Sequence, residues 1–270
     1  MRPSRNRIAA GMFFLTGLFI TAVACASLIQ PTRVPTAVPP TATTAPTETA
    51  APLYQQVKLE SAPWDDSGTP FDYTIKADVP VLVGSQDPRV QNFNVEMKAV
   101  VNDAVATFKQ NLAELTPTPN STTSTFELHY SVLSPPGNLI SLRFTIQTYY
   151  SGAAHPGDAS RTITYDLQDG RDLSLTDLFV PDSDYLNPIA KYCIAQLSTR
   201  DIGFQGFELG ATAAPENYRN WNITPDGLTI TFDEYQVAPY AAGPQTVVVP
   251  YSELAPLIRP DGPLAPYLHK

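Results

Sequence analysis

One histidine lies where its imidazole could do acid–base chemistry. His155 follows three small residues, 152–154, which let backbone segments pass closely, and Asp158 lies near enough in the sequence to orient the ring. Catalysis would also need a nucleophile or a metal beside the imidazole, and the sequence contains neither a Gly-x-Ser-x-Gly nor a His-Glu-x-x-His motif to supply one. The sequence therefore favours a turn-fixing hydrogen bond for His155, with catalysis as the alternative.

Four tyrosines form a second candidate set in two segments of the chain. Tyr149 and Tyr150 precede the turn that holds His155, and Tyr235 and Tyr240 precede the turn Ala241-Ala242-Gly243-Pro244. A tyrosine has an apolar ring and a polar tip, so it suits a protein interface or the stacking of a sugar. Aromatic residues in strands more often belong to the core. Core packing is therefore the alternative to binding for these four tyrosines, and His155 joins them as a candidate binding residue.

Asp233 and Glu234 look like a pair of catalytic carboxylates. They are consecutive, however, and neighbouring side chains of a strand point to opposite faces of the sheet. Without a bend they cannot act together as acid and base.

The two cysteines have different expected roles. Cys193 lies on the apolar face of a predicted helix, where burial keeps a thiol protonated and inert. Cys25 is the expected site of lipidation, and if it is not lipidated a disulfide between the two becomes an alternative. The three histidines lack metal-ligand spacing. We therefore expect neither a cofactor nor a metal site.

The N-terminal segment is typical of an export signal. Arg2, Arg5 and Arg7 precede the apolar run Ile8–Ala24, which ends in a small-x-small cleavage pattern directly before Cys25. The sequence predicts a lipoprotein-type signal peptide over residues 1–24 and a lipid-anchored protein that faces outside the cytoplasm. Ordinary secretion and an uncleaved anchor are the alternatives.

The next segment, residues 25–52, is predicted to be a disordered tether. Between Pro31 and Pro52, 18 of 22 residues are Pro, Thr or Ala, so there is little to bury and an extended, solvated backbone is favoured. At about 3 Å per residue such a segment reaches roughly 70 Å. That length would hold a domain away from a membrane surface and within a cell wall.

The charge balance is acidic, with 17 Lys and Arg against 26 Asp and Glu and a net charge of −9. Nucleic acid as a partner is disfavoured, because phosphates demand a basic surface. A cationic partner is compatible with this balance, although an acidic surface also serves solubility alone.

Hydrophobic periodicity predicts helices and strands after residue 53. An apolar stripe at intervals of three and four residues predicts a long helix that ends at Thr116, and a second helix is expected over residues 183–198. Alternating apolar residues predict a hairpin over residues 126–132 and 140–146, and further strands at 163–167, 228–232 and 246–249. The predicted class is α+β, a mainly antiparallel sheet with helices packed on it, in two small subdomains. The stripe of the long helix consists of Val90, Phe93, Met97, Val100 or Val101, Val105, Phe108 and Leu112.

Two segments carry a family resemblance. Tyr149–Phe179 combines a small-residue turn, a strand, an Asp-Gly turn and a helix entry, and Asp233–Leu254 forms a second block. Together with the segment near Phe93 and Asn94, they resemble the region shared by RsiV, a lysozyme-sensing anti-sigma factor, and by the non-catalytic N-terminal part of the peptidoglycan deacetylase PdaC. The resemblance spans roughly Leu53–Leu257. It implies a first subdomain over 53–165 and a second over 166–270.

The same resemblance implies an extracytoplasmic module. Only seven residues precede the apolar run, so we expect no anti-sigma segment, and the chain ends at Lys270 without a paired-histidine motif, so we expect no deacetylase. The leading hypothesis is a non-enzymatic binding or sensing module whose partner is a lysozyme-like protein or a peptidoglycan fragment. A structural envelope protein and a hydrolase of envelope polymers with a site near His155 are the alternatives.

Overall fold

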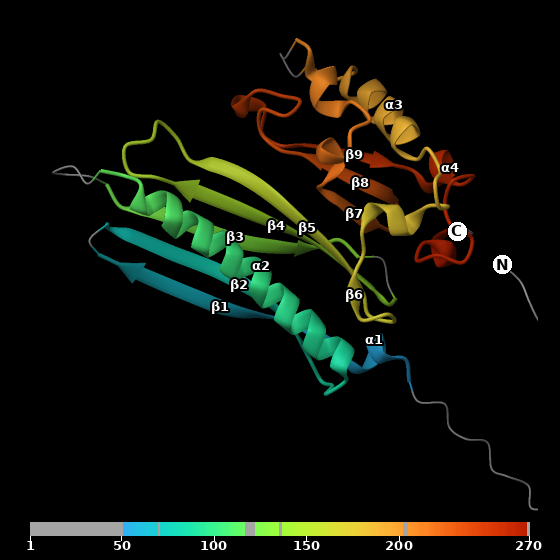
Figure 1. Cartoon of the computed structure of the whole chain (residues 1–270), viewed down its shortest axis with the longest axis horizontal. Helices are drawn as coiled ribbons and strands as arrows, with labels where there is room; N and C mark the ends of the chain where they lie inside the picture. Colours follow the sequence, from blue (N-terminus) through green and yellow to red (C-terminus); the bar gives the residue numbers. More distant parts are fainter. Residues whose placement is uncertain (1–50, 70, 117–121, 135–136, 202–204, 269–270) are drawn as a thin grey trace, which may run out of the picture. The chain divides into compact units, whose positions relative to one another are not determined.

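The larger of two sheets has six strands in the order β1-β2-β3-β4-β5-β6 (Figure 1). The computed structural model describes residues 51–69, 71–116, 122–134, 137–201 and 205–268. All neighbouring strands of this sheet run antiparallel except β2 and β3, which are parallel because helix α2 connects them. The elements are β1 (Lys58–Gly68), β2 (Tyr73–Val83), α2 (Pro88–Ala113), β3 (Ser124–Val132), β4 (Leu139–Tyr149), β5 (Gly157–Asp166) and β6 (Arg171–Asp172).

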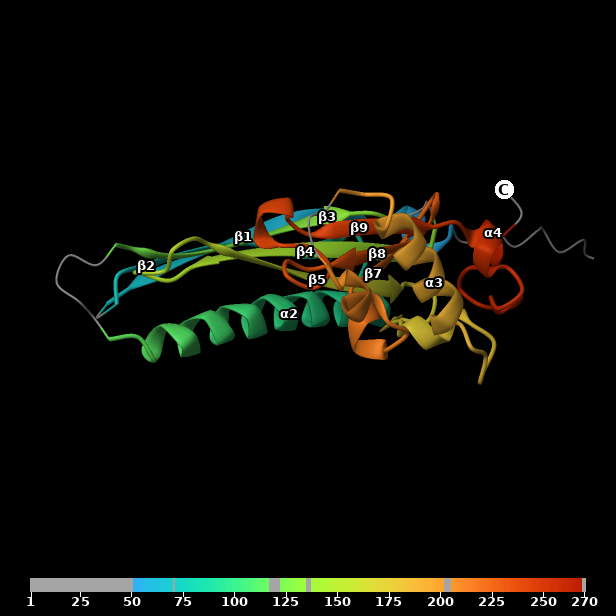
Figure 2. The ribbon, with the colours of Figure 1, turned by 90° about the horizontal axis from the view of Figure 1, so that it is seen from above.

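Helix α2 covers one face of the six-stranded sheet (Figure 2). Its first turn is capped by Asp87, whose side chain accepts a hydrogen bond from the backbone N–H of Arg89 at 2.9 Å, and Pro88 occupies the first helical position. The buried residues of α2 are the predicted stripe, with both Val100 and Val101 inside. The long helix and its core face are confirmed.

The smaller sheet has three antiparallel strands in the order β7-β8-β9, and helix α3 packs against it. The second predicted helix is present but shorter than expected: it begins at Leu186, three residues after the predicted start at Ser183. The remaining helices and strands are α1 (Leu53–Gln56), η1 (Leu175–Leu178), α3 (Leu186–Leu197), η2 (Phe207–Ala211), η3 (Pro215–Tyr218), β7 (Trp221–Thr224), β8 (Gly227–Phe232), η4 (Tyr240–Ala242), β9 (Gln245–Val249), α4 (Tyr251–Leu254) and η5 (Ala265–Tyr267).

Each sheet has its own hydrophobic core. The core under α2 draws its buried residues from the segment 75–167, and the core around α3 draws on the segment 173–267 together with Leu139. The α+β class, with mainly antiparallel sheet and helices packed on it, is confirmed, and the division into two subdomains stays a prediction. The boundary after Tyr165 stays a prediction, and β6, which lies beyond it, still pairs with β5.

Side-chain hydroxyls join β7 to the larger sheet. Ser141 Oγ, in β4, accepts hydrogen bonds from Asn222 Nδ2 at 2.9 Å and from the backbone N–H of Ile223 at 3.1 Å. Thr162 Oγ1, in β5, accepts one from the backbone N–H of Trp221 at 2.9 Å. All three bonds replace water at buried or half-buried polar groups, so the contact between the two sheets is specific.

Cys193 lies in the core around α3 with a free, fully buried thiol. Burial raises the pKa of the Cys193 thiol to about 12. The predicted signal peptide, Cys25 and the tether as far as residue 50 lie outside the described residues. Among the residues that are described, no helix has both the length and the apolar character needed to cross a membrane.

Candidate functional site

Three of the five predicted binding residues meet at one place. The rings of His155 and Tyr240 have their centroids 3.9 Å apart, and those of Tyr235 and Tyr240 are stacked at 6.2 Å with an interplanar angle of 26°. We call His155, Tyr235 and Tyr240 the aromatic patch. The Tyr235 side of the patch faces solvent, since this residue is 59% exposed.

Tyr235 has an unusual backbone conformation. Its φ of +63° lies in the left-handed region, which is unfavourable for a bulky residue by about 1–2 kcal/mol. The turn is fixed from both sides, because Tyr235 donates its backbone N–H to the carbonyl of Ala238 at 3.0 Å and Gln236 Nε2 donates to the carbonyl of Gly210 at 2.9 Å. An exposed aromatic ring held in a strained turn is a common sign of a functional contact.

Asp233 and Glu234 attach this turn to the outer edge of β5. Asp233 Oδ1 accepts a hydrogen bond from the backbone N–H of Ser160 at 2.9 Å, and Glu234 Oε2 accepts one from that of Asp158 at 3.2 Å. Both carboxylates therefore serve as acceptors for an otherwise open strand edge. The sequence-based argument against an acid–base pair agrees with these roles. Burial raises the pKa of Tyr240, and the negative charges of Glu234 and Asp158 add to that shift.

His155 makes a local hydrogen bond. Its Nδ1 lies 2.7 Å from the carbonyl oxygen of Pro156, which can only accept, so Nδ1 carries the proton. Asp158 does not orient the imidazole as the sequence suggested, because its carboxylate accepts from Gln147 Nε2 at 3.0 Å. The ring of Tyr240 is the other neighbour. Within the described ranges, no group of three or more His, Cys, Asp or Glu residues has metal-binding geometry.

Tyr149 and Tyr150 make their contacts away from the patch. The Tyr150 ring stacks on Phe108 of α2 at 5.3 Å, and its hydroxyl accepts a hydrogen bond from Asn111 Nδ2 at 3.1 Å. The Tyr149 hydroxyl lies 3.3 Å from Thr122 Oγ1. Packing on α2 explains Tyr150 better than ligand contact does, which is the core alternative that the sequence left open.

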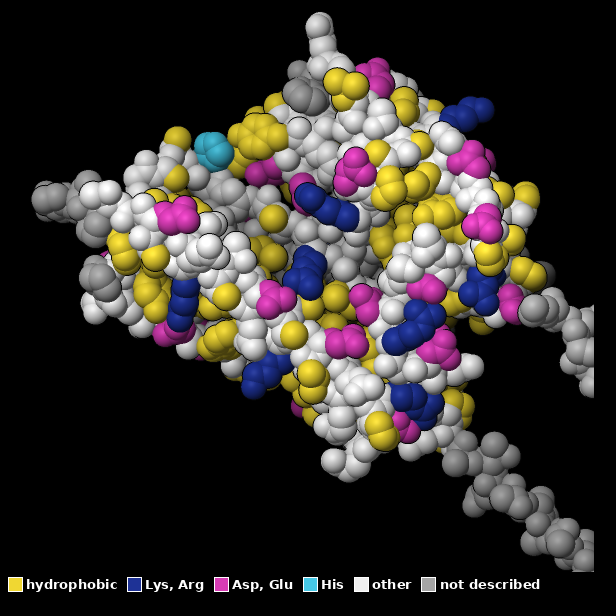
Figure 3. Space-filling view, viewed as in Figure 1, with side chains coloured by type: hydrophobic (Ala, Val, Ile, Leu, Met, Phe, Trp, Pro, Cys, Tyr) yellow, Lys and Arg dark blue, Asp and Glu magenta, His cyan; other side chains and the backbone are white. Residues whose placement is uncertain are grey.

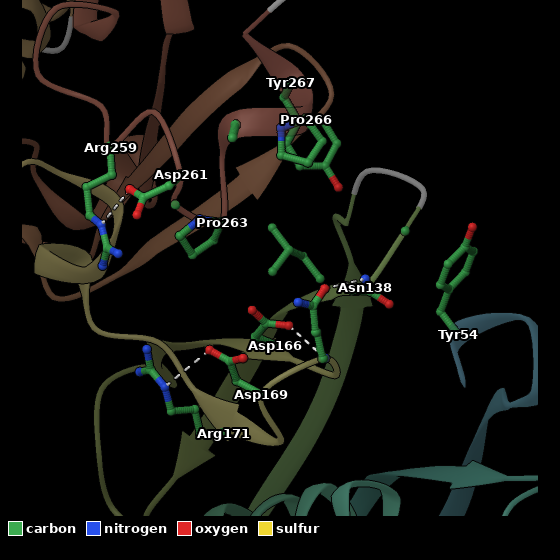
Figure 4. A pocket seen from close by; sticks show the side chains of 15 residues that line it. Tyr54, Asn138, Asp166, Asp169, Arg171, Arg259, Asp261, Pro263, Pro266 and Tyr267 are labelled. Carbon is green, nitrogen blue, oxygen red and sulfur yellow. Dashed lines mark hydrogen bonds and ion pairs between the residues drawn. The ribbon is translucent and has the colours of Figure 1, made fainter. Parts of the chain in front are cut away.

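A cavity of about 540 Å³ was not predicted from the sequence (Figure 4). Its walls come from α1, from the start of β4, from the turn between β5 and β6, and from the segment 259–267. The structure thereby joins residues far apart in the sequence, and no local motif marks them. Side chains that line the cavity include Tyr54, Asn138, Asp166, Gln168, Asp169, Arg171, Arg259, Asp261 and Tyr267.

Asp166 is the most buried of the charged groups in this cavity, with 8% of its surface exposed. Burial raises the pKa of Asp166, and a hydrogen bond of 2.7 Å from the backbone N–H of Gln168 partly offsets that effect. Burial likewise raises the pKa of Tyr267, and Asp166 and Tyr54 contribute to the shift. Asp166 and Tyr54 therefore lie close enough to Tyr267 to affect the pKa of its hydroxyl.

Similarity to known proteins identifies one part of the chain. Residues 176–252 match the family model of DUF3298, described as a protein of unknown function. The DUF3298 match contains Tyr235 and Tyr240 of the aromatic patch, whereas His155 lies before it. The patch thus combines a residue outside the matched segment with two residues inside it.

Curated relatives extend the similarity toward the N-terminus. The chain is 23% identical over 208 residues to the peptidoglycan-N-acetylmuramic acid deacetylase PdaC of Bacillus subtilis, which covers 76% of this chain and 43% of PdaC. It is 26% identical to the immunogenic protein MPT64 of Mycobacterium tuberculosis over 50% of this chain and 57% of that protein. The expected resemblance to a region of PdaC is confirmed, and the chain spans about half the length of the relatives that it matches.

Two solved structures of DUF3298 family proteins share the fold. One, from Bacteroides fragilis, superposes with a TM-score of 0.60 at 17% identity and covers 79% of this chain and 97% of that one. The other, from Pseudomonas aeruginosa, has a TM-score of 0.53 at 16% identity and covers 76% and 95%. Each superposition covers more than three quarters of this chain, so the overall fold is shared with other DUF3298 proteins.

Proposed function

We propose that this chain is a non-enzymatic extracytoplasmic binding module, tethered to the membrane through lipid on Cys25. Its partner is a lysozyme-like protein or a peptidoglycan fragment, met by the aromatic patch. The observation that carries the proposal is the exposed, strained position of Tyr235 beside Tyr240 and His155. Aromatic area that is held rigid and open to solvent suits recognition, because little conformational entropy is lost on binding.

Charge supports a cationic protein as one of the two partners. The chain has a net charge of −9, and Asp158 and Glu234 lie next to the patch. On the face drawn in Figure 3, however, basic and acidic side chains alternate, so no continuous field of one sign covers it. Electrostatic attraction would therefore raise the association rate, while the aromatic rings would provide most of the contact.

The similarity to PdaC, a peptidoglycan-N-acetylmuramic acid deacetylase, supports peptidoglycan as the alternative partner. The activity of PdaC is not carried over, since the chain spans 43% of that protein. A hydrolase with a site near His155 is less well supported, because the described contacts of its ring are a carbonyl oxygen and a tyrosine. An envelope protein without a dedicated ligand is the remaining alternative.

Capture assays separate these functions. The purified protein should bind immobilised lysozyme or soluble peptidoglycan fragments at moderate salt, and Tyr235→Ala together with Tyr240→Ala should weaken that binding. His155→Ala tests the hydrolase alternative. If the wild-type protein degrades a wall polymer and this variant does not, the protein is a hydrolase and the binding proposal is wrong. Absence of capture combined with absence of turnover would leave the structural alternative.

A further inference from the structure

We propose that the cavity between α1, the β5–β6 turn and the segment 259–267 binds a neutral saccharide. This inference goes beyond the proposed function, because none of its lining residues belongs to the aromatic patch. The volume of about 540 Å³ lies within the range of small-ligand sites. A di- or trisaccharide segment fits that size.

The charges of the lining disfavour an anionic ligand. Arg171 Nη1 lies 3.1 Å from Asp177 Oδ2, and Arg259 Nε lies 3.7 Å from Asp261 Oδ1. Both guanidinium groups that line the cavity therefore already face a carboxylate, as Figure 4 shows for the pair Arg259–Asp261. A ligand carboxylate or phosphate would have to compete with these partners and would also meet Asp166 and Asp169.

The same side chains suit hydroxyl groups. A sugar hydroxyl both donates and accepts, so it can donate to a carboxylate and accept from an amide or a guanidinium at once. Asn138 and Gln168 provide amides, with Asn138 Nδ2 at 3.3 Å from Gln168 Oε1, and Asp166 provides a buried acceptor. The paired charges and the amides of the cavity thus offer both donors and acceptors of hydrogen bonds, and they do not require a charged ligand.

Two tyrosines add apolar walls for the C–H faces of a sugar. Tyr54 comes from α1, and Tyr267 comes from the C-terminal segment next to Pro266 (Figure 4). The backbone at Gly137, with φ of +135°, passes close to Tyr267, since a Cβ at this position would lie 3.2 Å from the tyrosine hydroxyl. The small residue at 137 therefore lets the chain approach this wall. Aromatic walls combined with few convergent polar groups are typical of ligand sites.

Calorimetric titration with chitotriose, a neutral oligomer of N-acetylglucosamine, tests the inference. Wild-type protein should bind it, and Tyr54→Ala should weaken binding about three- to tenfold, the range expected for one lost aromatic contact. Asp166→Asn should also weaken binding. The matched control is Val95→Ala, which truncates an exposed side chain of α2 outside both the cavity and the aromatic patch and should leave chitotriose binding unchanged.

A hyaluronan tetrasaccharide, which carries carboxylates on alternate sugars, provides the anionic probe and should bind more weakly than chitotriose. Tighter binding of hyaluronan, or no binding of chitotriose, would overturn the inference. Loss of chitotriose binding in Tyr235→Ala with full binding in Tyr54→Ala would also overturn it, and would support the aromatic patch as the glycan site. Because Tyr54 lies on the short exposed helix α1, its variant decides the question even if Asp166→Asn unfolds.

Discussion

Asp233 Oδ1 accepts a hydrogen bond of 2.9 Å from the backbone N–H of Ser160, a residue 73 positions earlier in the chain. The same carboxylate accepts from Asn220 Nδ2 at 3.0 Å and faces Arg219 Nη2 at 3.3 Å. One side chain of the smaller subdomain thus satisfies the edge of β5 in the larger sheet. The position of the aromatic patch depends on this contact, because Tyr235 follows two residues later.

Asp233→Ala should lower the free energy of unfolding by about 1.5–3 kcal/mol, the range for hydrogen bonds to a charged group. The side chain is 12% exposed, so water does not readily replace the lost acceptor. Urea unfolding followed by far-UV circular dichroism measures the change. Asp65→Ala, at an exposed aspartate of β1, is the matched control and should stay within about 0.5 kcal/mol of wild type. Equal effects of the two variants would contradict the structural role of Asp233.

Tyr235→Asn should separate stability from binding. Asparagine tolerates a positive φ, so relief of backbone strain should leave the unfolding free energy unchanged or raise it by up to about 1 kcal/mol. Partner capture should nevertheless fall, because the exposed ring is lost. Tyr235→Val is the control, since a β-branched residue is less compatible with φ of +63° and should destabilise the protein. A large loss of stability in Tyr235→Asn would mean that the ring supports the fold.

Asn94→Ala tests a side-chain amide that pairs with the backbone of β2 as a neighbouring strand would. Asn94 Oδ1 accepts from the backbone N–H of Leu82 at 2.7 Å, and its Nδ2 donates to the Leu82 carbonyl at 3.0 Å. Beyond Ala77, the part of β2 that pairs with β3 has ended, so these two groups would otherwise lack a ladder partner. The variant should lose about 1–3 kcal/mol. Asn102→Ala, at an exposed asparagine of the same helix, should cost far less.

The Cys193 thiol should be unreactive in the folded protein. Burial raises its pKa from an ordinary value of 9.0 to about 12, so iodoacetamide at pH 8 should label it only after unfolding in urea. Above pH 9 the unfolded chain loses the thiol proton while the folded chain keeps it. The resulting stabilisation is complete below pH 9 and is lost as the pH rises toward 12. Between pH 9 and 11, Cys193→Ala should therefore lose stability less steeply than wild type.

Periodicity predicted the elements whose sequence carries one buried face. In the segment Val90–Leu112, the spacing of apolar residues at three and four positions predicts a helix, and the same spacing predicts which face of that helix is buried. The strands β1 and β2 were not predicted. β1 lies at the sheet edge and is mostly exposed, so it shows no clean alternation, and Pro63 and Pro80 within the two strands weaken the signal further. Pairing over eleven residues, which no local pattern encodes, forms this hairpin.

The candidate site was predicted in part for a related reason. His155, Tyr235 and Tyr240 were singled out by residue type and turn context, but their contact depends on how Asp233 and Glu234 reach β5. Tyr150 had the same residue type and packs on Phe108 instead. The cavity was missed because its walls are brought together only by the tertiary fold. Residue type therefore suggests candidate site residues, but tertiary contacts determine which of them lie together.

The predicted anchor is the last consequence to test. The sequence Ala22-Val23-Ala24-Cys25 at the end of the apolar run predicts cleavage after Ala24 and lipid on the new N-terminal cysteine. Expressed in a bacterial host, the protein should partition into the membrane fraction, and Cys25→Ser should release it or leave it unprocessed. Cys193→Ser is the matched control, because it changes the other cysteine and should not alter partitioning. Mass spectrometry of the mature N-terminus decides the question, since an unmodified Cys25, or an intact segment 2–24, would contradict lipid anchoring.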